Sequence, residues 1–87
     1  MDFVNAIIDT DKYGVSVIAG LFEHSQDEKK LLALIKEILN SWLVVYEYSE
    51  DELNEWANSL LNEKETEVCN GSKLYVQWCL GIHKIEE

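Results

Sequence analysis

The chain contains no proline, no arginine and no apolar run approaching the roughly 18 residues of a membrane-spanning helix. No linker-like segment divides it, so its 87 residues are expected to form one small acidic domain, residues 1–87. The two cysteines, Cys69 and Cys79, lack the paired spacing of a zinc site. We expect both to be reduced, partly buried thiols.

Positive charge is scarce as well. Seven lysines stand against 17 acids, which gives a formal net charge of -10. Such a chain repels phosphates, so direct binding to nucleic acid is disfavoured and a basic protein partner is favoured. The alternative is that the acidity only keeps a small protein soluble. The acidic N-terminus, Met1-Asp2-Phe3, does not resemble a secretory signal, so we expect a cytoplasmic protein with no membrane association.

Two capping boxes predict two helices. Ser25 and Glu28 have the spacing of the first, and Ser49 and Glu52 that of the second. Asn40 is a plausible end for the first helix. Apolar residues recur at helical spacing after each box. The first stripe is Leu31, Leu34, Ile35, Ile38, Leu39 and Trp42, and the second is Leu53, Trp56, Ala57, Leu60 and Leu61.

Strands are predicted elsewhere. Residues 43–48 are rich in Val and Tyr, and residues 74–82 alternate apolar and polar side chains after the Asn70-Gly71 turn pair. Residues 15–22 fit both the helical and the strand period, with a weak preference for a strand, whereas residues 2–8 predict a short helix.

The expected fold class is α+β, a small antiparallel sheet packed against two amphipathic helices. The alternative is an all-α bundle.

No catalytic or cofactor motif is present, and we expect no enzyme activity, no cofactor and no metal. Asp9, Asp11 and Gly14 match the first half of a calcium loop, but Gly20 stands where the closing glutamate is needed, so a plain turn is favoured. Cys79 and His83 share a side of either a helix or a strand. Little positive charge lies nearby to activate the thiol, so a packed cysteine and a surface histidine are favoured.

Most of the charge imbalance is local. Residues 47–67 carry eight acids against Lys64, a net charge of -7 in 21 residues. Aromatic anchors supply contact energy at protein interfaces, and charges supply steering and register. If residues 43–48 form a strand, Val44, Tyr46 and Tyr48 share one face of it. The predicted partner-binding residues are therefore Tyr46, Glu47, Tyr48, Glu50, Asp51, Glu52, Glu55, Glu63, Glu65 and Glu67.

These features favour a small acidic inhibitor, of the immunity or phage-antagonist type. It would neutralise a basic nucleic-acid-handling protein, such as a nuclease toxin, by covering its active or substrate-binding site. Carboxylates that mimic phosphates are a variant of the same idea. The alternative from another class is a non-catalytic structural module that forms a homodimer through an exposed strand edge at residues 74–82.

Overall fold

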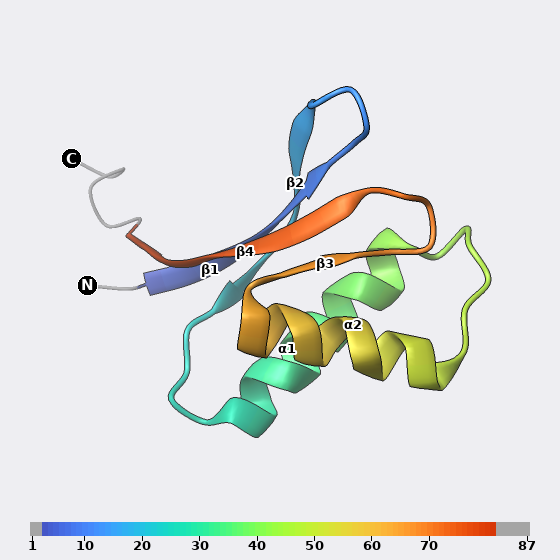
Figure 1. Ribbon diagram of the computed structural model, residues 1–87. Coiled ribbons are helices and arrows are strands. Elements are labelled where there is room, and N and C mark those ends of the chain that lie inside the picture. The colour runs from blue at the N-terminus through green and yellow to red at the C-terminus, as the bar shows by residue number, and fades with distance from the viewer. Residues whose placement is uncertain (1–2, 82–87) are drawn as a thin grey trace.

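The computed structural model describes residues 3–81 as one antiparallel sheet with two helices on one side of it (Figure 1). The strand order is β2-β1-β4-β3, and each neighbouring pair is antiparallel. The α+β prediction is confirmed. Neither helix is long and apolar enough to cross a membrane, within the described residues. The elements are β1 (Phe3–Thr10), β2 (Ser16–Glu23), α1 (Glu28–Trp42), α2 (Glu50–Glu63), β3 (Glu65–Glu67) and β4 (Lys73–Gly81).

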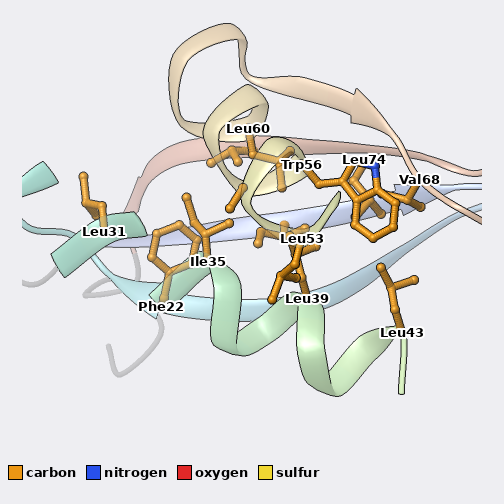
Figure 2. Close-up of a cluster of buried hydrophobic side chains, with 13 residues drawn as sticks. Phe22, Leu31, Ile35, Leu39, Leu43, Leu53, Trp56, Leu60, Val68 and Leu74 are labelled. Carbon is orange, nitrogen blue, oxygen red and sulfur yellow. The ribbon is translucent and has the colours of Figure 1, made fainter. Parts of the chain in front are cut away.

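The core lies between the sheet and the helices, and Figure 2 shows side chains from both layers meeting there. Helix α1 packs on β2, while α2 packs on β3 and β4. The predicted stripes of both helices supply much of this core. From α1 the buried residues are Leu31, Ile35 and Leu39, and from α2 they are Leu53, Trp56, Ala57 and Leu60.

The helix predicted for residues 2–8 is wrong, because Phe3–Thr10 form strand β1. This strand is an inner one, paired with β2 on one side and β4 on the other. Ala6 and Ile7 are both buried although they point to opposite faces, so the segment lacks the alternation of a half-exposed strand. A short apolar run of this kind does not distinguish a helix from a strand by its period.

The strand favoured for residues 15–22 is confirmed as β2, which lies at one edge of the sheet. Its approach to α1 is close at Gly20. A Cβ built on Gly20 would lie 2.7 Å from the Cγ2 atom of Ile38, so only glycine fits this crossing without a shift. The edge predicted at residues 74–82 is wrong at Leu74 and Tyr75, whereas from Gln77 to Gly81 β4 pairs with β1 only, and Ile82 lies outside the described residues. Strand β4 is an inner strand, flanked by β1 and, at Lys73–Tyr75, by β3.

The first capping box is also wrong. Helix α1 begins at Glu28 with Asp27 as N-cap, and the Asp27 side chain accepts from the backbone N–H of Lys29. The Ser25 hydroxyl accepts instead from the Asp27 N–H, so Ser25 shapes the turn before the helix. The helix then continues two residues past Asn40, because Trp42 and Leu43 find partners in the folded molecule.

The second capping box is confirmed in full. The Ser49 hydroxyl accepts from the N–H of Glu52, and the Glu52 carboxylate accepts from the N–H of Ser49. The hairpin at Asn70-Gly71 is confirmed too, as β3 and β4. Its connection is longer than a two-residue turn, because Glu67 pairs with Lys73 and leaves five residues, 68–72, in the loop.

Candidate protein-binding surface

The strand predicted for residues 43–48 is wrong, because these residues form the loop between α1 and α2. Leu43 is fully buried and caps α1, and its carbonyl accepts from the N–H of Tyr46. The β-branched Val44 and Val45 have no neighbouring strand to pair with and lie exposed. Propensity alone therefore does not place them in the sheet.

Four of the predicted partner-binding residues nevertheless meet at this loop. Tyr46, Glu47, Tyr48 and Glu50 line one surface hollow of about 700 Å³. Its other walls come from the end of α1 and from the residues around the loop. They are Glu37, Asn40, Ser41, Val44 and Ser49. The hollow thus joins three carboxylates and two phenol rings, a combination suited to a cationic side chain.

The two tyrosines play different parts. Tyr46 is 42% exposed, and its hydroxyl lies 3.5 Å from the side-chain nitrogen of Asn70 in the β3–β4 loop. Tyr48 is half-buried against the core, and its hydroxyl donates a 2.6 Å hydrogen bond to the Oδ1 of Asn40. Its ring centroid lies 5.5 Å from that of Trp56. Tyr48 therefore helps to fix the loop, whereas Tyr46 is available to a partner.

Helix α2 extends the acidic surface from the hollow. Asp51 and Glu55 are exposed and stand at i and i+4, so their like charges repel each other. Glu50 is exposed as well, and its carboxylate lies 3.8 Å from the Nζ of Lys36, a pair of little energetic weight at a solvated site. Glu52 is exposed but committed to the capping box. The acidic surface is defined here as Glu37, Tyr46, Glu47, Glu50, Asp51 and Glu55.

The remaining three predicted residues lie elsewhere. Glu63 ends α2, 13 residues beyond Glu50, which corresponds to about 20 Å along the helix. Glu65 and Glu67 line a separate hollow of about 450 Å³, whose walls also include Lys12 and Lys73. Both strand residues pair with β4 residues that face away from the helices. The structure therefore does not bring these three glutamates into the acidic surface.

Sequence reasoning missed Glu37, which is not among the predicted partner-binding residues. It lies on the same helix face as Asn40 and Ser41, and that face becomes a wall of the hollow once the loop folds back. Helical spacing relates these α1 residues to one another but not to residues 46–50. No local pattern could have joined the two segments.

The other chemical candidates have structural explanations. The Asp11 carboxylate accepts from the N–H groups of Tyr13 and Val15 and so closes the β1–β2 turn, where Gly14 has a φ of 85°. Among the described residues no group of three His, Cys, Asp or Glu side chains could hold a metal ion. Cys69 is a free thiol in the hairpin loop, but the prediction that it is partly buried is wrong because the loop leaves it exposed. His83 lies outside the described residues.

Surface geometry is the basis for any functional assignment, because no protein-family model, no curated protein and no solved structure was found to match the chain.

Proposed function

We propose that this chain is a small acidic inhibitor, of the immunity or phage-antagonist type, that acts in the cytoplasm. Its partner is a basic protein that handles nucleic acid, such as a nuclease toxin, and the acidic surface covers the partner's active or substrate-binding site. The observation that carries the proposal is the position of the charge. Residues 47–67 hold a net charge of -7, and their exposed acids at the start of α2 adjoin a hollow beside a half-exposed tyrosine.

Electrostatics supports a cationic partner in particular. Asp51 and Glu55 repel each other along α2, and Lys36 of α1 pairs with Glu50 rather than with either of them. A lysine or arginine brought by a partner would relieve that repulsion. It would also speed encounter, since opposite charges steer two proteins together before they touch.

Shape supports a localised contact. The hollow offers carboxylates from α1, the loop and α2, so one basic side chain could reach acceptors from three parts of the chain. Tyr46 borders the hollow and can pack against the stem of that side chain. Once an acidic protein sits over a cationic cleft, a polyanionic substrate is excluded by both volume and charge.

The test is capture of partners from the native host, followed by reconstitution. The immobilised chain is exposed to host lysate at low ionic strength, captured proteins are identified by mass spectrometry, and the purified candidates are assayed for nuclease or nucleic-acid-binding activity. We expect a basic protein whose activity falls when the chain is added, and whose association slows as salt rises. Recovery of neutral or acidic partners alone would contradict the proposal.

A matched pair of variants tests whether the acidic surface is the part of the chain that contacts the partner. Asp51→Lys with Glu55→Lys reverses two charges of the acidic surface, whereas Glu23→Lys with Glu28→Lys makes the same change in net charge elsewhere. Glu52 is left intact because of its capping bond. We expect the first variant to lose inhibition and the second to retain most of it. Equal loss of inhibition in both variants would show that only net charge matters and would contradict the proposed binding surface.

A further inference from the structure

Charge is divided between the two edges of the sheet. Residues 12–46, which include β2 and α1, hold four lysines and four acids and are neutral overall, whereas residues 47–67 carry -7. Helix α1 packs on β2, and α2 packs on β3 and β4. Because β2 and β3 are the two outer strands, the molecule has a neutral edge at β2 and an acidic region toward β3 (Figure 1).

Among the residues whose burial is described, the neutral edge and the turn before it hold most of the exposed large apolar side chains. From Tyr13 to Phe22 the sequence has no charged residue. Five large apolar side chains of this segment are between 46% and 80% exposed: Tyr13, Val15, Val17, Ile18 and Leu21. Val17, Ile18 and Leu21 belong to β2, whereas Tyr13 and Val15 lie in the turn before it. Exposed apolar residues gathered in one region are typical of an interaction site, whereas scattered ones are not.

Strand β2 has few of the features that protect a sheet edge. Among residues 3–81 it pairs with β1 only, so its outer backbone groups face no other strand. Native edges are commonly blocked by lysine, proline or inward-pointing charge. Strand β2 has none of these, and its one charged residue, Glu23, stands at its last position. The one protective feature that β2 carries is a β-bulge opposite Ile7 and Ile8, which places Ile18 and Leu21 on the same face.

We propose that β2 is the interface of a homodimer, in which the β2 strands of two copies pair antiparallel and form one continuous eight-stranded sheet. An uncharged antiparallel edge suits a second copy as the occupant, because it can pair with its own copy about a two-fold axis. Two molecules of net charge -10 repel each other, and this repulsion is least where both present a neutral edge. A two-fold axis near the middle of β2 would place the two Glu23 residues at opposite ends of the paired strands.

The arrangement has a functional consequence. The acidic surface lies on the loop, on the start of α2 and, at Glu37, on α1, and none of its residues belongs to β2. Dimerisation through the backbone edge of β2 would therefore leave both acidic surfaces open to partners. The homodimer does not depend on the proposed function, since it uses the other edge of the molecule.

Sedimentation of the full chain over a range of concentrations tests the dimer. We expect a concentration-dependent rise from 10.1 kDa to twice that mass. Added salt should leave the dimer intact or strengthen it, because screening reduces the repulsion between acidic copies. Salt should instead weaken binding to a basic partner, so the two proposals respond in opposite directions. A chain that stays monomeric at every concentration and ionic strength overturns the dimer.

A matched pair of double variants tests whether the outer edge of β2 forms the dimer interface. Val17→Lys with Ile18→Lys adds charge to β2, and Val44→Lys with Val45→Lys adds the same charge at exposed positions in the α1–α2 loop. We expect the β2 variant to weaken dimerisation more than about tenfold and the loop variant to have little effect. Undiminished dimerisation of a folded β2 variant overturns the interface.

Hydrogen exchange of the wild-type chain gives a result that needs no variant. Amides of β2 should become better protected as concentration rises, while those of β3, at the other edge, should not. Concentration-dependent protection confined to other elements would place the interface elsewhere and overturn the assignment to β2.

Discussion

The indole Nε1–H of Trp42 donates a 2.7 Å hydrogen bond to Oδ2 of Asp9, which joins the last residue of α1 to strand β1. Asp9 is 6% exposed, and among the described residues no lysine lies within ion-pair distance of it. The carboxylate therefore depends on a neutral donor for its buried oxygen, and α1 is held to the sheet at its final turn.

Loss of that donor should cost stability. Trp42→Phe keeps an aromatic ring but leaves the Asp9 oxygen without its N–H partner, so we expect a loss of about 2 kcal/mol in the free energy of unfolding. Asp9→Asn keeps an acceptor and removes the buried charge, so its effect should be within about 1 kcal/mol. Urea denaturation of both variants and of the double variant measures the coupling. Strictly additive losses would mean that the two side chains do not act as a pair.

The crossing of β2 over α1 predicts a second effect. Gly20→Ala places a methyl group where Ile38 already lies, and we expect overpacking to cost about 1–3 kcal/mol of unfolding free energy. Ile38→Ala should cost less in the Gly20→Ala background than in the wild type, because it opens the space that the new methyl needs. Thermal melts of the four proteins complete the cycle. Equal costs in both backgrounds would show that the clash is absorbed elsewhere.

The second capping box predicts a smaller loss. Ser49→Ala removes the acceptor for the Glu52 N–H, and we expect α2 and the whole domain to lose about 1 kcal/mol. Ser41→Ala, at an exposed position of α1, serves as the control and should change stability by less than about 0.5 kcal/mol. Denaturant midpoints of the two variants provide the comparison, and matching midpoints would contradict a capping role for Ser49.

The two tyrosines of the loop should separate binding from stability. Tyr46→Ala is expected to leave the melting temperature nearly unchanged and to weaken binding to the basic partner, because its ring is half exposed beside the hollow. Tyr48→Ala should instead destabilise the domain by about 2–3 kcal/mol, since its ring packs on Trp56 and the core. Calorimetric melts and binding titrations on both variants give the two readouts. The opposite result would mean that Tyr46 stabilises the fold and Tyr48 contacts the partner.

Local sequence determined the two helical stripes, the capping box at Ser49 and the hairpin at Asn70-Gly71. In each case the pattern is defined by residues that stand within about four positions of one another in the sequence, so it can be recognised without the fold. Residues 15–22 were placed correctly on weaker grounds, through β-branched content and flanking glycines. The net charge of -7 in residues 47–67 also needs no fold to be recognised.

Tertiary structure decided the rest. Phe3–Thr10 became a strand because both of its edges find partners, β2 nearby and β4 about 70 positions away in the sequence. Val44 and Val45 stayed outside the sheet because the chain turns from α1 into α2 at this point, and Leu43 rather than either valine enters the core. The hollow, the contribution of Glu37 and the exclusion of Glu63, Glu65 and Glu67 all depend on how distant segments meet. Charge can be counted along a chain, but its position on a surface is fixed only when the helices pack on the sheet.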